Sequence, residues 1–168
     1  THYLDPINLA DAGGFTAHGD AHNANVWFET VAAQPKLSYF DPAFAGKHIP
    51  SLLAEVKPTF HNVFAHPLWL YDSKDAEAEF KAVAKYQNET LFIDSDWALS
   101  RVRERLLSAK IDYFWKPFLK ELALRDMLPI SWQQTLRSAL AMCPALVMNL
   151  RSGVGRHNPT SSAIAFSI

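Results

Sequence analysis

The sequence predicts an α+β fold that is mainly α, and three observations lead to this prediction. The 168 residues are 49% hydrophobic and 20% charged, the composition of a globular domain with a sizeable core. The first part, to about residue 72, combines short apolar runs with many Gly, Pro, His and aromatic residues. Residues 73–151 instead repeat apolar side chains at intervals of three and four, which is typical of helices.

Two short strands are expected in the first part, joined as a hairpin. Residues 25–29 (NVWFE) and 36–41 (KLSYFD) are rich in β-branched and aromatic side chains, and a connection suited to a turn separates them. Pro42 ends the second strand, because proline has no backbone N–H to donate to a ladder. The hairpin would then bring the segment before its first strand close to the segment after its second.

A layer of helices is expected over residues 73–151. The periodicity places these helices at residues 75–86, 97–109, 111–125 and 132–150. Ser73 or Asp75 would cap the first helix and Asp96 the second, since short polar side chains accept hydrogen bonds from a first helical turn. Pro117 would kink or restart the third helix, and Pro144 would interrupt the fourth.

The last segment, residues 152–168, is predicted to be an irregular tail. It contains two glycines, a proline and a run of Ser and Thr, which favour turns and loops. We therefore place one domain at residues 1–151, followed by this tail.

Charge and cysteine content exclude several classes of partner. With 16 basic and 17 acidic residues the net charge is −1, so neither nucleic acid nor an anionic membrane surface is an expected partner. No uncharged apolar run reaches the ~18 residues that a membrane span needs, and nothing resembles a secretory signal. Cys143 is the only cysteine, which excludes an internal disulfide and a cysteine-built zinc site and predicts a reducing, cytoplasmic setting.

The strongest chemical pattern is HGDAHNAN at residues 18–25, followed by FDPAFAG at residues 40–46. Asp20 and Asn25 are separated by the interval found in the protein-kinase catalytic loop, where the Asp receives the proton of the substrate hydroxyl and the Asn holds magnesium. Asp41 follows after a strand–turn–strand stretch, where a second magnesium-binding carboxylate belongs. Phosphoryl transfer needs such hard oxygen ligands and one proton acceptor near the attacking hydroxyl.

The pattern His-Gly-Asp-x-His-x-x-Asn resembles the catalytic loop of the aminoglycoside phosphotransferase and choline kinase-like superfamily, which shares the protein-kinase fold. Residues 14–46 carry the resemblance directly. It implies that the chain is the C-terminal, helical lobe of a protein-kinase-like fold, with a short β-hairpin carrying the catalytic loop (residues 18–25) and the metal loop (residues 40–46). It also implies an ATP-dependent phosphotransferase that acts on a hydroxyl of a small molecule, with Mg²⁺ and ATP as cofactors.

The resemblance also assigns roles to single residues. Asp20 would be the catalytic base, and His18 and His22 would order the catalytic loop around it. Asn25 and Asp41 would be the magnesium ligands. The motif leaves the acceptor open, because acceptor pockets are built from variable helices and loops.

The chain departs from the superfamily in lacking the parts of an N-terminal lobe. No Gly-rich phosphate loop, strand Lys or partner Glu occurs, and only 17 residues precede His18. We therefore expect the C-terminal catalytic portion of a longer protein, inactive alone and binding ATP with a dissociation constant weaker than ~1 mM. Apolar surface facing the absent lobe would favour self-association or association with that lobe. The alternative function is that of an inactive kinase-like remnant or helical binding module.

Two further segments have alternative interpretations. A zinc site of His18, His22, His61 and His66 competes with magnesium, although an Asp–Asn–Asp set suits magnesium better. The segment Lys57–Trp69, dense in aromatic residues and histidine, either lines an acceptor pocket or packs as a loop beneath the helices.

Overall fold

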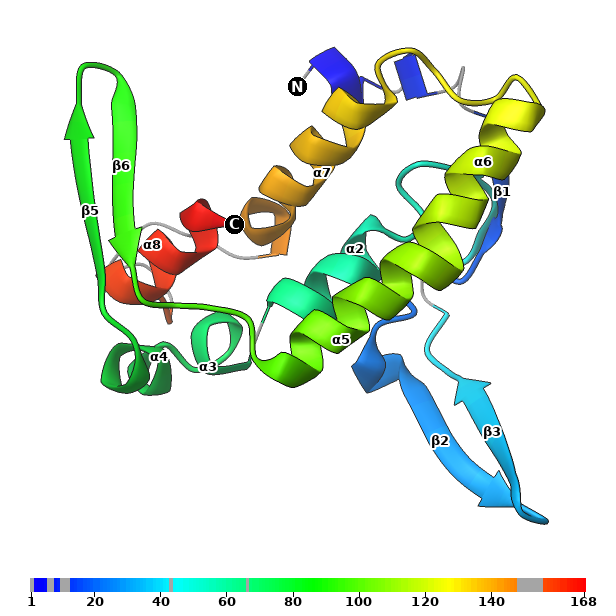
Figure 1. Cartoon of the computed structure of the whole chain (residues 1–168), viewed down its shortest axis with the longest axis horizontal. Helices are drawn as coiled ribbons and strands as arrows, with labels where there is room; N and C mark the ends of the chain where they lie inside the picture. The colour runs from blue at the N-terminus through cyan, green and yellow to red at the C-terminus, as the bar shows by residue number, and fades with distance from the viewer. Residues whose placement is uncertain (1, 6–7, 10–12, 43, 66, 148–155) are drawn as a thin grey trace.

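The computed structural model describes residues 2–5, 8–9, 13–42, 44–65, 67–147 and 156–168. Over these residues the fold is α+β with helices predominating, as predicted. The sheets in this part of the chain are three separate antiparallel pairs of strands. Figure 1 shows two of these pairs extending as arms from a helical body.

The strands of the first part form two nested pairs. These are β1 (Gly14–Ala17) with β4 (Gly46–Pro50), and β2 (Val26–Val31) with β3 (Gln34–Tyr39). Because the β1–β4 pair encloses the β2–β3 pair along the chain, the segment after β1 and the segment before β4 both lie between the two sheets. The nesting therefore brings the two predicted loops side by side.

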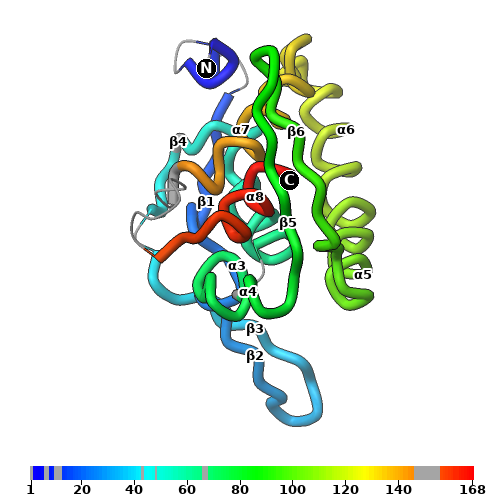
Figure 2. Tube along the Cα trace, turned by 90° about the vertical axis from the view of Figure 1, so that its left-hand side faces the viewer, coloured from blue at the N-terminus to red at the C-terminus, as the bar shows by residue number. Residues whose placement is uncertain are grey.

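The predicted hairpin is confirmed as β2–β3. Its strands extend further toward the turn than expected, and Ala32 and Ala33 alone connect them with φ angles of 50° and 64°. Such left-handed two-residue turns match the twist of the strands they join. The hairpin projects away from the body in both views (Figures 1 and 2). Trp27, Phe28 and Leu37 on it are exposed.

The helices that follow form the body of the fold, and the first of them support the loop after β1. They are α2 (Val56–Thr59), η3 (Phe60–Phe64), α3 (Pro67–Leu70), α4 (Ser73–Glu79), α5 (Arg101–Lys110), η4 (Ile111–Trp115), α6 (Lys116–Leu124), α7 (Trp132–Val147) and α8 (Pro159–Ser167). The turns η3 and η4 are π-helical, and α5, η4 and α6 run on as one rod (Figure 1). Short 3₁₀ turns, η1 (His2–Leu4) and η2 (Asn23–Asn25), precede them.

The core lies where α2, η3, α3, α7 and α8 meet. Phe60 and Trp69 are completely buried in it, with Ile164 of α8. Cys143 is buried in the same cluster, as predicted, and burial raises the pKa of its thiol to about 11. A smaller cluster around Leu52 and Leu122 joins α6 to the segment before α2.

The predicted helix over residues 75–86 is wrong beyond Glu79. Phe80 is extended, and β5 (Ala82–Gln87) pairs with β6 (Thr90–Ser95) as a second hairpin within the expected helical layer. Asn88 and Glu89 connect these strands with φ angles of 51° and 58°. Asn tolerates this left-handed conformation, so the turn overrides the apolar spacing of three and four.

The cap predicted at Asp96 is also wrong. Helix α5 begins at Arg101, and the Ser100 hydroxyl accepts the hydrogen bond from the Arg103 N–H at its first turn. Asp96 instead accepts a 2.7 Å hydrogen bond from the Lys81 N–H and closes the base of the β5–β6 hairpin. Neither proline interrupts its helix: Pro117 follows the π-helical turn η4 inside the continuous α5–η4–α6 rod, and α7 continues through Pro144.

The predicted irregular tail contains a helix. Residues 152–155, like residues 148–151, lie outside the described part, but residues 159–167 form α8. Asn158 accepts from the Ser161 N–H at 2.9 Å while the Ser161 hydroxyl accepts from the Asn158 N–H, a reciprocal capping box. Residues 161–165 of this helix are buried, and the helix packs against α4 and β5 (Figure 2).

Within the described residues, no helix is both long enough and apolar enough to cross a membrane.

Candidate functional site

The candidate catalytic loop follows β1 and wraps around Asp20. Its Asp20 and Asn25 side chains are both buried, which is unusual for polar residues on a loop. The Asn25 amide donates a 2.9 Å hydrogen bond to the Asp20 carbonyl oxygen, so the asparagine closes the loop on itself. Gly19 makes the turn possible, since its φ of 79° is a left-handed conformation that side chains other than glycine rarely adopt.

His18 links the catalytic loop to the metal loop. Its Nδ1 accepts a hydrogen bond from the Asp20 N–H at 3.3 Å, so in the neutral ring the proton lies on Nε2. That Nε2 lies 3.0 Å from the carbonyl oxygen of Phe40, to which it donates. This is the arrangement that a loop-ordering role requires, because the contact ties Asp20 to the residue just before Asp41.

His22 repeats the same local pattern four residues later. Its Nδ1 accepts from the Ala24 N–H at 3.2 Å, which again leaves the proton on Nε2. The Nε2 atom lies 3.5 Å from Asp20 Oδ1 and faces the carboxylate. The ring also stacks on His61 of η3, with centroids 5.3 Å apart.

Lys57 of α2 is the nearest cation to Asp20 and was not predicted as a site residue. Its Nζ lies 2.7 Å from Asp20 Oδ1 and 5.1 Å from the centre of the Phe44 ring. The contact is an ion pair, and this buried oxygen has no hydrogen-bond partner among the described residues. The ammonium offsets the carboxylate charge in a partly buried site.

His61 completes the cluster around the loop. Its Nδ1 lies 3.2 Å from the Tyr71 hydroxyl, and its buried Nε2 has no hydrogen-bond partner in the described structure. Burial above all, and then the charges of His22 and Lys57, lower the pKa of His61 to about 4 against the opposing effect of Asp20. Burial and Asp20 raise the pKa of Tyr71. His61 is therefore neutral at pH 7.

Asn62, the next residue of η3, anchors the loop from outside. Its Oδ1 accepts a 2.8 Å hydrogen bond from the Asn23 N–H, and its carbonyl oxygen accepts from the Arg103 guanidinium. A short polar path therefore leads from the catalytic loop through η3 to α5. Residues 57–64 and 67–69 of the segment Lys57–Trp69 are helical rather than a loop: Phe60 and Trp69 fill the core, while Lys57 and Asn62 contact Asp20 and Asn23.

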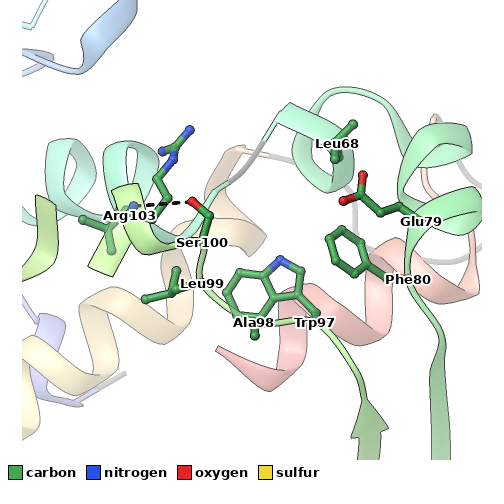
Figure 3. A pocket seen from close by; sticks show the side chains of 9 residues that line it. Leu68, Glu79, Phe80, Trp97, Ala98, Leu99, Ser100 and Arg103 are labelled. Carbon is green, nitrogen blue, oxygen red and sulfur yellow. Dashed lines mark hydrogen bonds between the residues drawn. The ribbon is translucent and has the colours of Figure 1, made fainter. Parts of the chain in front are cut away.

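Arg103 also reaches a small cavity of about 140 Å³ beside α5. Figure 3 shows the rings of Phe80 and Trp97 at its wall, with Glu79 on one side and Ser100 and Arg103 on the other. In the described part of the chain, Arg103 is linked to the catalytic loop through Asn62. The cavity is thus a neighbour of the candidate site rather than part of it.

Asp41 begins the metal loop directly beyond β3. The Phe40 N–H donates a 3.2 Å hydrogen bond to the Asn25 carbonyl, so Asn25 and Phe40 extend the β2–β3 ladder by one pair. Asp41 follows with a φ of 54° and an exposed side chain. A Cβ on Gly19 would lie 2.2 Å from the Phe44 carbonyl oxygen, which shows how closely the two loops approach.

The described residues do not support the zinc alternative. They contain no group of three His, Cys, Asp or Glu side chains able to hold a metal ion, and His66 lies outside them. The Nδ1 atoms of His18 and His22 already accept backbone hydrogen bonds. The oxygen-bearing side chains near the hairpin base are those of Asp20, Asn25 and Asp41, and Asp41 directly follows the Asn25–Phe40 pair.

Comparisons with protein-family models, with curated proteins and with solved structures found no match to this chain.

Proposed function

We propose that this chain is the C-terminal catalytic portion of a kinase-like, ATP-dependent phosphotransferase that acts on a hydroxyl of a small molecule. The observation that carries the proposal is the nesting of β2–β3 inside β1–β4, which brings buried Asp20 and Asn25 beside Asp41. Phosphoryl transfer requires positioning and charge stabilisation more than covalent chemistry, and this arrangement of oxygens provides for both.

In this proposal Asp20 accepts the proton of the acceptor hydroxyl as the oxygen–phosphorus bond forms and the bond to the leaving nucleotide breaks. Asn25 and Asp41 would hold magnesium, which would neutralise charge on the transferred phosphate. His18 and His22 keep the Asp20 backbone and carboxylate in place. Lys57 offsets the negative charge of Asp20 until substrate binds.

One observation favours the inactive remnant as a second candidate. The Lys57 ammonium occupies one face of the Asp20 carboxylate, which is how an unused acidic site would be neutralised. In that case the loop persists as a structural element, and magnesium has no binding site there.

Metal binding by the isolated chain distinguishes the two candidates. Mn²⁺, a paramagnetic substitute for Mg²⁺, should broaden the backbone amide signals around Asn25 and Asp41 in an NMR titration and leave β5–β6 sharp. Excess Mg²⁺ should reverse the broadening. Asp41→Ala should abolish it, because one hard oxygen ligand is lost.

Asp94→Ala is the matched control. Asp94 is an exposed carboxylate on a strand of the other hairpin, so its removal should leave the broadening unchanged. Uniform broadening that Asp41→Ala does not alter, or no broadening at millimolar Mn²⁺, would contradict the phosphotransferase assignment and favour the remnant.

A further inference from the structure

A second cavity lies beside the candidate site and has an unusual lining. Its volume is about 340 Å³, within the range of small-molecule pockets. Lys57 is the one charged residue among the described residues that line it. The remaining lining residues are apolar: Leu4, Leu53, Val56, Ala139, Met142 and Cys143.

The cavity and the candidate base share one side chain. Lys57 lines the cavity, and its Nζ lies 2.7 Å from Asp20 Oδ1. The charge of Lys57 also acts on Cys143, another lining residue. It opposes the rise that burial causes in the pKa of the Cys143 thiol. A ligand with its body between α2 and α7 would therefore direct its polar end toward Lys57 and Asp20.

The charge of the lining restricts what can bind. A cationic acceptor would lose its hydration in a nearly apolar lining and would approach Lys57, because Asp20 lies behind Lys57 and is not among the described lining residues. A polyhydroxylated acceptor would leave most of its hydroxyls without hydrogen-bond partners, which costs free energy. An apolar molecule with one hydroxyl meets neither penalty, since its body is buried and its oxygen can accept from Lys57.

We propose that this cavity binds the phosphoryl acceptor and that the acceptor is a neutral alcohol with an apolar body. This inference rests on the proposed function for its catalytic meaning, but the binding itself requires neither magnesium nor ATP. Its hydroxyl would accept a hydrogen bond from Lys57 and donate its own proton toward Asp20.

The test compares two probes that share one apolar body. 1-Octanol is neutral, whereas octylamine is protonated at pH 7. In NMR titrations of the chain, 1-octanol should shift the backbone amide signals of Ala139, Met142 and Cys143 saturably. Octylamine should bind at least about tenfold more weakly because of its repulsion by Lys57.

Two variants examine the cavity and the charge separately. Met142→Trp should fill the cavity and abolish 1-octanol binding, while Gln133→Trp, on an exposed position of the same helix, should not. Lys57→Gln leaves the cavity open and makes the Asp20 carboxylate the nearest charge, so it should remove or reverse the preference for 1-octanol. Circular dichroism identifies a variant that fails to fold, and the wild-type comparison of the two probes remains decisive in that case.

Equal or tighter binding of octylamine by the wild type, or no saturable binding of 1-octanol, would overturn the inference. So would discrimination that persists in Lys57→Gln. These failures are separable from failure of the proposed function, because Mn²⁺ can still broaden Asn25 and Asp41 in a chain whose cavity binds no alcohol. Conversely, alcohol binding without Mn²⁺ broadening would leave an apolar ligand site and remove the phosphotransferase.

Discussion

The Lys57 ammonium lies 2.7 Å from the Asp20 carboxylate, and the two side chains are 33% and 10% exposed. This pair joins the first helix of the body to the loop that carries the motif. Because Asp20 is nearly buried, removing Lys57 would leave its carboxylate without the compensating charge beside it. The strength of this compensation can be measured.

Lys57→Met should lower the free energy of unfolding by about 2 kcal/mol, less than the cost of breaking a fully buried pair because Lys57 is partly exposed. Adding Asp20→Asn should recover part of this loss, so that the double variant is about 1–2 kcal/mol more stable than additivity predicts. Urea unfolding measures all three variants. Lys36→Met, which breaks the exposed pair with Glu29, is the control and should cost less than about 0.5 kcal/mol. Strict additivity would show that the Lys57–Asp20 contact carries no energy.

His61 should make the protein less stable in mild acid. Its pKa is lowered to about 4 in the folded state, so between pH 6.5 and 4 the unfolded chain binds more protons than the folded one. The stability due to neutral His61 is complete above pH 6.5 and is lost as the pH falls toward 4, by at most about 3 kcal/mol. Burial also lowers the pKa of His157, so His61→Gln should remove only part of this slope in urea unfolding. An unchanged slope in that variant would exclude His61 as a source.

Gly19→Ala should disrupt the contact between the two loops. The new Cβ would lie 2.2 Å from the Phe44 carbonyl oxygen at a φ of 79°, so both backbone segments must move. A loss of about 2–3 kcal/mol of stability is expected, with changed amide shifts at Asp20 and Phe44. At Gly46 the nearest atom is the flexible Ile49 Cδ1 at 3.2 Å, so Gly46→Ala serves as the tolerated comparison. Equal effects of the two substitutions would contradict this account.

Asn158→Ala should destabilise α8 and its packing on α4. The substitution removes the capping box and a 2.7 Å hydrogen bond from the Asn158 amide to the Ser73 carbonyl. The expected loss is about 1–2 kcal/mol by thermal or urea unfolding. Gln133→Ala on the exposed part of α7 should change stability by less than about 0.5 kcal/mol. Equal losses of stability in Asn158→Ala and Gln133→Ala would show that the cap contributes nothing.

Asp20→Asn should lower phosphotransferase turnover at least ~100-fold with little change in nucleotide affinity, since a general base acts mainly in the transition state. The assay uses the full-length protein of which this chain is proposed to be the catalytic portion, with MgATP as donor. Asp41→Ala should instead weaken metal-dependent nucleotide binding. Near-normal turnover of the Asp20 variant would remove Asp20 from the catalytic role.

The parts of the site that were predictable from the sequence are those held by local contacts. Asp20 and Asn25 belong to one loop whose hydrogen bonds span a few residues, and the strands that place Asp41 form a simple hairpin. The contacts of Lys57 with Asp20 and of His61 with His22 were not predicted, because both residues reach the loop from helices far along the chain. Only tertiary packing decides which of several lysines and histidines lies beside a given carboxylate.

The missed elements had local signals that were outweighed by others. Asn88 favours a left-handed turn, which indicates the β5–β6 hairpin. The spacing of Ala76, Phe80, Val83 and Ala84, however, also fits a helix. For α8, Asn158 followed by Pro159 is a common helix start, but the preceding glycines suggested a loop. In both cases short elements gain their stability from neighbours, which the sequence pattern does not reveal.

The β2–β3 hairpin has a dynamic consequence for the site at its base. A two-stranded sheet standing alone in water is only marginally stable, so its ladder should open from the Ala32–Ala33 turn inward. Hydrogen exchange would then be fastest near the turn and slowest at the Phe40 N–H, which bonds to Asn25 beside the anchored loops. Each ladder pair that opens would loosen the positions of Asn25 and Asp41 at the base of the hairpin, and a partner that covered the exposed Trp27 would slow this opening.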